Sequence, residues 1–317
     1  MSVLVVVEHD RGRIAQASLE AFAFAGGIAA QLGVEVEALL IGADALDLAD
    51  ECAARGAATV HHVPDAAVTD YGPDAYGAAV AGAVGVLSPS AVVASGSDRG
   101  NEVLAYAAAD LDLPFVANCL EVKTADDWEM TRVQWGGSLN EEARLTSPMP
   151  IVSSAPHSVE VGEPISGATA VVNTLDVSLP ESLMATMIQD RIVLTEGVTL
   201  ATAPVVIGGG RGVGSAEGFD VLEALAAKLG GVVGCSRAVT NNGWRPHSDQ
   251  VGQTGTRIAP QLYIACGISG AIQHWVGAKA AKKILAINID PAANMVVKAD
   301  YAIIGDLFEV LPAITNG

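Results

Sequence analysis

The chain has 317 residues and a formal net charge of −19, and half of its residues are hydrophobic but only 4% are aromatic. This length predicts two domains, because single hydrophobic cores rarely grow beyond about 250–300 residues. An acidic chain argues against nucleic acid as a partner, and no apolar run reaches the roughly 18 residues of a membrane helix. The opening stretch Ser2–His9 is too short and too uncharged for a secretory signal, so we expect a soluble, cytoplasmic protein.

The cysteines and histidines show no metal-binding pattern. The four cysteines are far apart and form no CxxC pair: Cys52, Cys119, Cys235 and Cys266. Such thiols suit a reducing compartment and a structural role. The pair His61-His62 and the lone His157 have no partner at metal-ligand spacing. We therefore predict that the chain binds no metal.

The charge is distributed unevenly along the chain. Residues 1–200 contain 28 acidic and 8 basic side chains, whereas residues 201–317 contain 8 acidic and 9 basic side chains. A near-neutral final segment suits a domain that encloses an anionic ligand. An acidic first domain that keeps the protein in solution would give the same distribution, so charge alone does not decide between the two.

The first part of the chain alternates strand patterns with helical patterns. This βαβα order predicts an α/β fold with a mostly parallel sheet. Between residues 115 and 177 the pattern changes to shorter strand-like pieces interrupted by Gly and Pro, and a break follows near residues 179–202. The predicted strands are Val3–Val7, Val34–Ile41, Thr59–Val63 and Ala91–Ser95, and the predicted helices are Ile14–Leu32, Asp44–Ala54, Pro73–Leu87 and Arg99–Leu111.

A second βα series begins after the break and predicts a smaller doubly wound domain. The glycine-rich segment 208–214 follows its first strand, and a helix with 3.6-residue periodicity follows at Glu217–Leu229. We place the domains at residues 1–192 and 193–317. The predicted strands are Pro204–Ile207, Gly231–Cys235, Leu262–Cys266, Ile284–Ile289 and Tyr301–Ile304.

Glycine or polar residues follow all five strands of this second series. Open α/β sheets bind ligands beyond the carboxyl ends of their strands, so these residues are expected to meet at one site. They are Gly208–Gly214 with Arg211, Ser236 with Arg237, Gly267–His274, Asn288 with Asp290, and Gly305 with Asp306.

The glycine-rich segment matches no common nucleotide fingerprint. No frame of residues 208–214 gives GxGxxG, and no lysine follows Gly214 as a P-loop requires. The segment suits a tight strand-to-helix turn equally well. Arg211 favours a phosphate, because a guanidinium beside exposed backbone amides binds oxyanions.

Two further segments point to a ligand. Gly267 and Gly270 allow a sharp turn that exposes amides at a helix start, from which Gln273 and His274 project. The segment Val251–Gly255 (VGQTG) is a polar loop between glycines, although an ordinary surface turn would look the same. Arg237, unless it is simply solvated, would stabilise negative charge on a nearby redox ring. In the first domain, Ser97-Asp98-Arg99 could imitate a nucleotide site, but a helix N-cap explains it better.

These segments closely resemble the alpha subunit of electron transfer flavoprotein, the family also called FixB. The resemblance extends through residues 204–312 and is looser in the first domain. Residues 240–244 and 291–295 are less typical of the family. We expect no fused ferredoxin-like module, because this sequence shows no cysteine-rich extension. The matching strings are GGGRGVGS (208–215), GCSR (234–237), VGQTG (251–255), QLYIACGISGAIQH (261–274), AINID (286–290) and ADYAIIGDLFEVLP (299–312).

The resemblance implies FAD as cofactor and assigns its contacts. Ser236 and Ser269 would serve the pyrophosphate and ribityl region, and Arg237 would stabilise negative charge on the ring. Thr254 would lie near flavin N5 and His274 near O2. The full set of implied FAD positions is Arg211, Ser236, Arg237, Val251, Gly252, Gln253, Thr254, Ser269, Gly270, Ala271, Ile272, Gln273, His274, Asn288, Asp306 and Leu307.

The resemblance also implies an electron carrier that performs no substrate chemistry of its own. The chain would form an obligate heterodimer with a beta subunit through its first domain. It would accept electrons from dehydrogenases, typically of the acyl-CoA type of fatty acid β-oxidation, and pass them to a quinone oxidoreductase. A linker near residues 180–203 would let the FAD domain swing between partners. The rival interpretations are a NAD-dependent oxidoreductase, which lacks the fingerprint, and an interaction module without cofactor, which the polar strand ends disfavour.

Overall fold

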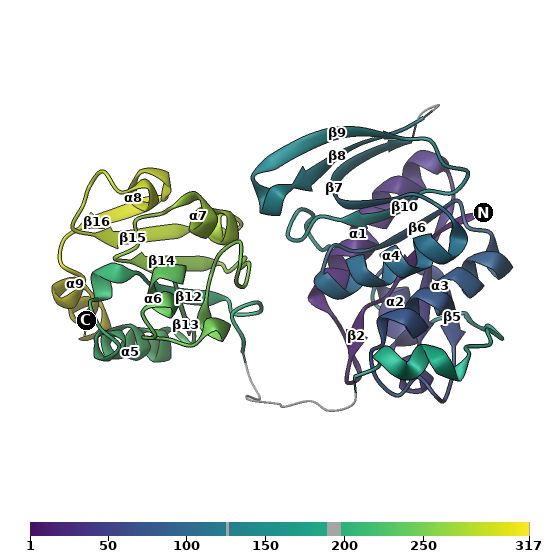
Figure 1. The fold of residues 1–317 in the computed structure, drawn as a ribbon, viewed down its shortest axis with the longest axis horizontal. Coiled ribbons are helices and arrows are strands. Elements are labelled where there is room, and N and C mark those ends of the chain that lie inside the picture. Colours follow the sequence, from purple (N-terminus) through teal and green to yellow (C-terminus); the bar gives the residue numbers. More distant parts are fainter. Residues whose placement is uncertain (125–126, 189–197, 317) are drawn as a thin grey trace. The chain divides into compact units, whose positions relative to one another are not determined.

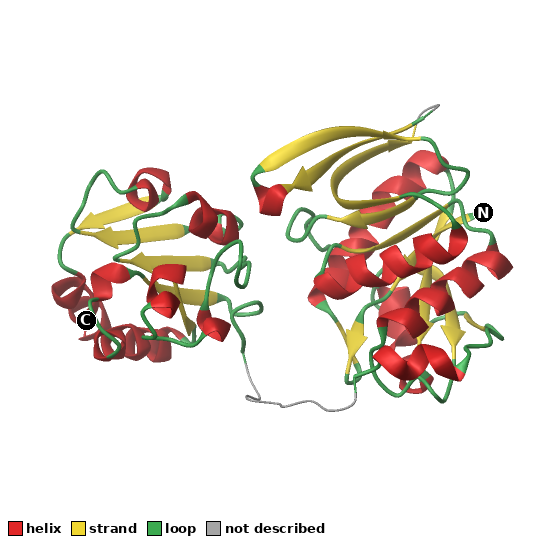
Figure 2. Cartoon of the chain, in the orientation of Figure 1, coloured by secondary structure: helices red, strands yellow, loops and turns green. Residues whose placement is uncertain are grey.

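The computed structural model describes residues 1–124, 127–188 and 198–316 of the chain. It divides into two compact units, Met1–Ile192 and Val193–Gly317, and each is described by itself (Figure 1). Both units combine parallel sheets with helices, so the predicted α/β class is confirmed (Figure 2). Within the described residues no helix is long and apolar enough to cross a membrane, and no group of three metal-ligating side chains occurs.

The first unit is built on a nine-stranded sheet with the order β11-β5-β4-β1-β6-β10-β7-β8-β9. A two-stranded hairpin, β2–β3, follows β1. The strands are β1 (Ser2–Val6), β2 (His9–Asp10), β3 (Arg13–Ile14), β4 (Glu35–Ile41), β5 (Ala57–Val63), β6 (Ala91–Ser95), β7 (Phe115–Thr124), β8 (Trp128–Gln134), β9 (Leu139–Leu145), β10 (Ile151–Ser154) and β11 (Val172–Thr174). The helices are α1 (Gln16–Leu32), α2 (Ala49–Ala54), α3 (Pro73–Leu87) and α4 (Asp98–Leu111).

Helices cover both faces of this sheet, because its central strand is apolar on both sides. Val3 and Val5 of β1 pack in the core shared with α1 and α2. Leu4 and Val6 point to the opposite face and pack in the core shared with α3 and α4. The alternation of side chains along one strand therefore divides the hydrophobic core into two layers.

Strands β7, β8 and β9 correct the expectation of short interrupted pieces between residues 115 and 177. They are long, and β8 pairs antiparallel with both of its neighbours. One face is buried through Met130 and Leu145, while the other carries charged pairs such as Arg144 with Glu129, 3.2 Å apart. Strands covered on one side only are rich in charge, which is why apolar runs did not reveal them.

The first residues of the predicted linker belong to the first unit. Residues 181–186 form a short 3-10 helix, and its Leu183 and Met184 pack against the α3–α4 core. The Ile188 amide donates a 2.8 Å hydrogen bond to the Tyr71 carbonyl, so the first unit continues to this point. Residues 189–197 of the predicted linker lie outside the described residues.

The second unit contains a five-stranded parallel sheet with the order β13-β12-β14-β15-β16. Its core again has two layers, one centred on Phe219 and Leu222 and the other on Tyr263 and Met295. The strands are β12 (Val205–Gly209), β13 (Val232–Cys235), β14 (Leu262–Cys266), β15 (Ile284–Asn288) and β16 (Tyr301–Ile304). The helices are α5 (Asp220–Leu229), α6 (Arg237–Asn241), α7 (Ile272–Ala278), α8 (Asn294–Lys298) and α9 (Leu307–Asn316).

The four cysteines are buried and unbridged. Burial raises the pKa of each thiol to about 12, so none is a reactive thiolate near neutral pH.

Candidate functional site

In the second unit the order in which the chain adds strands to the sheet reverses between β12 and β14, which makes this place a topological switch point. In an open parallel sheet, ligands bind outside the carboxyl ends of the strands at such a switch point. The loops that follow these two strands contact each other directly. The Gly210 amide donates to the Cys266 carbonyl at 2.8 Å, and the Gly212 amide donates to the Gly267 carbonyl at 3.1 Å.

The contact between these loops explains why residues 208–214 are rich in glycine. A Cβ atom at Gly210 would lie 2.2 Å from the Gly267 carbonyl oxygen, and one at Gly212 would lie 2.7 Å from the Gly267 Cα atom. Gly267 also has a positive φ of 62°, which other residues rarely adopt. The glycines therefore allow two backbones to meet at the mouth of the site, although they match no nucleotide fingerprint.

A cavity of about 530 Å³ opens at this point, within the range of ligand pockets. Nine of the predicted site residues line it: Arg211, Ser236, Arg237, Ser269, Gly270, Ala271, Gln273, His274 and Asn288. Gly210, Gly212, Gly267, Ile268 and Asp290 also line it and belong to the strand-end segments expected from the sequence, whereas Ala238, Ile289 and Ala293 were not predicted. These three were missed because an aliphatic wall leaves no polar signal in the sequence.

The arginine and serine side chains of the cavity are free to meet a ligand. Arg211 and Arg237 are exposed, and neither has a carboxylate within ion-pair distance among the residues that the structure describes. The hydroxyls of Ser236 and Ser269 likewise have no hydrogen-bond partner in the described parts of the chain. Two guanidinium groups and two hydroxyls around one cavity form a donor set suited to a phosphate-bearing ligand.

Asn288 lines the cavity, but its side chain already forms hydrogen bonds with the backbone of two neighbouring loops. Its amide nitrogen donates to the Ile268 carbonyl at 3.0 Å, and its carbonyl oxygen accepts from the Asp290 amide at 3.0 Å. It therefore joins the loop after β14 to the loop after β15 and shapes the cavity wall.

The loop 251–255 does not line the cavity but packs against the start of α7. The Gln253 amide donates to the Gln273 carbonyl at 2.8 Å, and Gly252 lies close to the backbone of Gln273 and His274. Val251 is buried, and Thr254 accepts a 3.0 Å hydrogen bond from the side chain of Gln250.

Gln250 is a supporting residue that the sequence reasoning missed. It is 1% exposed, and its side chain joins Thr254 to Thr240 of α6, whose hydroxyl donates to it at 2.7 Å. A glutamine next to the loop carries no distinctive signal by itself. Only the packing shows that it joins the loop to the helix that begins at Arg237.

Besides the loop 251–254, three predicted positions lie away from the cavity lining. Ile272 is 51% exposed at the start of α7, and Leu307 is buried in the core. The Asp306 carboxylate accepts a 2.9 Å hydrogen bond from the Phe308 amide at the beginning of α9.

His274 is buried at the inner end of the cavity. Its Nε2 atom lies 2.8 Å from the hydroxyl of Tyr263, which is fully buried on β14. Burial lowers the pKa of His274 to about 4, so the ring is neutral at physiological pH. Tyr263 also explains why residue 208 is a glycine, because a Cβ atom at this position would lie 2.1 Å from the Tyr263 hydroxyl.

Comparison with known proteins places both units in one family. Residues 3–180 match the family model described as electron transfer flavoprotein domain, and residues 199–279 match the one described as electron transfer flavoprotein FAD-binding domain. The chain belongs to the electron transfer flavoprotein alpha-subunit family. The resemblance stated from the sequence is therefore confirmed.

Curated relatives from this family match over nearly the whole chain. It is 36% identical to electron transfer flavoprotein subunit alpha of Bacillus subtilis, covering 99% of this chain and 96% of the relative. The probable mitochondrial alpha subunit of Caenorhabditis elegans is also 36% identical, over 99% of this chain and 92% of the relative. Protein FixB of Clostridium saccharobutylicum is 33% identical, over 98% of this chain and 94% of the relative.

FAD is the cofactor of the family domain that matches the second unit, and the residues present fit it. Glycines of the loops after β12 and β14, among them Gly212 and Gly270, line the cavity, and a backbone without side chains allows a ligand to approach closely. The guanidinium groups of Arg211 and Arg237 supply positive charge for a pyrophosphate and for an electron-rich ring.

Proposed function

We propose that this chain is the FAD-holding alpha subunit of an electron carrier. It accepts electrons from dehydrogenases, typically of the acyl-CoA type, and passes them to a quinone oxidoreductase. The observation that carries the proposal is the cavity at the β12–β14 switch point, with its unpaired arginines, inside the domain that matches the family's FAD-binding domain. When bound, the flavin supplies the capacity to accept and release electrons.

The protein's own residues hold and tune the cofactor in this proposal. Ser236, Ser269 and Arg211 hold the phosphate and ribityl region, and the amides after β14 add further donors. Arg237 places a positive charge beside the ring, which favours reduction because negative charge develops there.

The loop 251–254 and α7 complete the proposed flavin site. Gln253 and Thr254 face the ring, with the threonine hydroxyl near N5. His274, near the O2 edge, is held by Tyr263 at 2.8 Å and acts as a neutral imidazole, since burial lowers its pKa to about 4. We assign the adenosine end of the site to the loops that carry Asn288, Asp306 and Leu307.

The chain works as a carrier in this proposal, and it performs no bond-making chemistry on a substrate. The titratable group buried beside the cavity is His274, and its depressed pKa makes it a weak base. The four thiols, with pKa values raised to about 12, are poor nucleophiles. The beta subunit binds the first unit and completes the heterodimer.

A visible absorption spectrum tests the cofactor assignment. The chain is co-expressed with its beta subunit, purified by a tag on the alpha chain, and examined for flavin bands that bleach on anaerobic addition of dithionite. A colourless complex that takes up no added FAD would overturn the assignment. The donor assignment is tested by mixing the oxidised complex with a substrate-reduced acyl-CoA dehydrogenase, where an absence of bleaching rules out this class of donor.

A further inference from the structure

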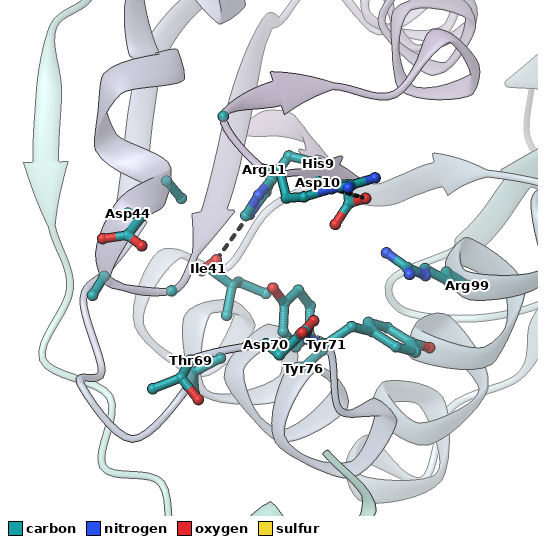
Figure 3. A pocket seen from close by; sticks show the side chains of 15 residues that line it. His9, Asp10, Arg11, Ile41, Asp44, Thr69, Asp70, Tyr71, Tyr76 and Arg99 are labelled. Carbon is teal, nitrogen blue, oxygen red and sulfur yellow. Dashed lines mark hydrogen bonds and ion pairs between the residues drawn. The ribbon is translucent and has the colours of Figure 1, made fainter. Parts of the chain in front are cut away.

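A second cavity, of about 320 Å³, lies in the first unit at the carboxyl ends of its central strands (Figure 3). Strand β1 lies between β4 and β6 and is parallel to both. The chain passes from β1 to β4 and β5 on one side and then returns to β6 on the other. The cavity is thus at the switch point of its own sheet, where open α/β sheets bind ligands.

The lining comes from the segments that follow four different strands. These segments are residues 9–12 after β1, 41–45 after β4, 68–71 after β5, and Arg99 near the start of α4 after β6, joined by Tyr76 of α3. The serine that precedes Arg99 by two positions caps α4, since the Ser97 hydroxyl accepts from the Gly100 amide at 2.9 Å. The N-cap expected from the sequence is present, and the arginine behind it faces a cavity.

Arg99 is held in place without being neutralised. Its guanidinium lies over the ring of Tyr71, 4.7 Å from the centroid, and the Tyr71 hydroxyl donates to Glu102 at 2.7 Å. Among the described residues, no carboxylate lies within ion-pair distance of Arg99. The flat face of the Arg99 guanidinium is covered by Tyr71, whereas its edge, which carries the N–H donors, remains open to an anion.

Arg11 adds a second guanidinium from the tip of the β2–β3 hairpin. Arg11 and Gly12 have positive φ angles of 47° and 71°, as in a turn that favours Asn-Gly. An arginine in this conformation is uncommon, and such backbone strain often marks a functional residue. Its ion pair with Asp10, at 3.3 Å, is exposed and therefore weak.

Three carboxylates line the cavity, namely Asp10, which pairs with Arg11, and also Asp44 and Asp70. Asp44 lies across the cavity from Arg99, and Asp70 lies beside Tyr71 and Tyr76 (Figure 3). Carboxylates accept hydrogen bonds from hydroxyl groups but repel a bare phosphate. The rings of Tyr71 and Tyr76, with centroids 5.4 Å apart, provide a wall for the body of a ligand.

From this arrangement we propose that the cavity binds a phosphate monoester of a polyhydroxylated molecule. The phosphate lies between Arg99 and Arg11, and the hydroxyl groups face Asp44 and Asp70. A sugar phosphate and a mononucleotide share this chemistry, and the cavity volume is at the lower end of the range for small-molecule pockets. The site is independent of the FAD site, because it is formed by the first unit alone.

Isothermal titration calorimetry of the full chain, purified with its partner subunit, tests this proposal. The probes are ribose 5-phosphate, AMP and inorganic phosphate. At least one ester should bind saturably, and inorganic phosphate should bind at least tenfold more weakly. Tighter binding of AMP identifies a nucleotide as the ligand, and tighter binding of ribose 5-phosphate identifies a sugar phosphate. Absence of saturable ester binding, or equal binding of inorganic phosphate, would overturn the proposal.

Matched arginine variants locate the binding. Arg99→Ala and Arg11→Ala should each weaken ester binding at least tenfold, and the second change is at an exposed hairpin tip where the fold tolerates it. Arg144→Ala, on exposed β9, and Arg211→Ala, in the cavity of the second unit, should bind like the unmodified chain. Loss of binding in Arg211→Ala with full binding in Arg99→Ala would assign the ester to the second unit and refute the proposal.

Discussion

The side chain of Gln250 donates a 3.0 Å hydrogen bond to the hydroxyl of Thr254 and accepts a 2.7 Å hydrogen bond from Thr240. Thr240 belongs to α6, the helix that begins with Arg237, so a single buried amide joins the loop and the helix that we assign to the flavin ring. The positions of Thr254 and Arg237 therefore depend on a residue that contacts neither the solvent nor the cavity lining.

Replacement of Gln250 should loosen this part of the site. Gln250→Ala removes two hydrogen bonds and is expected to lower the free energy of unfolding of the second unit by about 1–3 kcal/mol, because buried partners are left unsatisfied. Urea unfolding followed by the fluorescence of Trp244 and Trp275 measures the change. Gln261→Ala, at an exposed position, is the control. Coincident unfolding midpoints for the two variants would refute the supporting role of Gln250.

The burial of His274 predicts a pH-dependent stability. Its pKa in the folded protein is about 4, below the ordinary value of 6.5, so the unfolded chain binds a proton at a pH where the folded chain does not. The stabilisation is complete above pH 6.5 and is lost as the pH falls toward 4. The expected loss from this one group is at most about 3 kcal/mol.

Urea unfolding of the second unit at pH 7.5 and at pH 5 measures this loss. His274→Gln should make the unfolding free energy less dependent on pH, because the titrating group is gone. His247→Gln, at an exposed position in the same unit, should keep the full dependence. Parallel pH profiles for the unmodified chain and His274→Gln would contradict the prediction.

The sequence predicted most of the parallel strands and the gathering of polar residues at one sheet edge. These features follow from local rules: apolar runs form buried strands, and the carboxyl ends of parallel strands meet at one edge. It did not predict β8 and β9, whose charged outer faces, including Glu129 and Arg144, hide their strand character. One-sided burial depends on what covers the sheet, and a local pattern does not contain that information.

The supporting residues of the site could not be predicted from the sequence either. Gln250 and Tyr263 act through contacts with Thr254 and His274, and these contacts exist only after the loop 251–255 and α7 have packed on the sheet. The neutral state of His274 has the same origin, because its pKa is set by burial. Residue type alone identifies a histidine as a group that can titrate, but the tertiary structure determines its pKa.

Arg237 should raise the reduction potential of the bound flavin. The positive charge favours the reduced ring, so Arg237→Ala is expected to lower the potential, by about 59 mV for each tenfold change in a one-electron equilibrium. A spectroelectrochemical titration measures this shift. Lys228→Ala removes the same charge from the exposed surface of α5 and should leave the potential unchanged. Equal potentials for Arg237→Ala and the unmodified protein would remove Arg237 from its assigned role.

The close contact between Gly210 and Gly267 should leave no room for a side chain at residue 210. Gly210→Ala places a Cβ atom 2.2 Å from the Gly267 carbonyl oxygen, so the loops after β12 and β14 must separate. Such overpacking typically costs about 1–3 kcal/mol, and it should also weaken FAD retention because the switch point is displaced. Both effects are measured on the same preparation, by urea unfolding and by the ratio of flavin to protein absorbance.

The control for this change is Gly85→Ala, at an exposed position of α3 in the first unit. There an added Cβ atom would have no other atom within 4 Å. This variant should keep its flavin content and lose no stability. If Gly210→Ala retained flavin and stability as well as Gly85→Ala does, the close approach of the two backbones would not be a requirement of the site. A joint loss of both properties in Gly210→Ala alone would show that the glycine-rich segment serves to bring the two loops together.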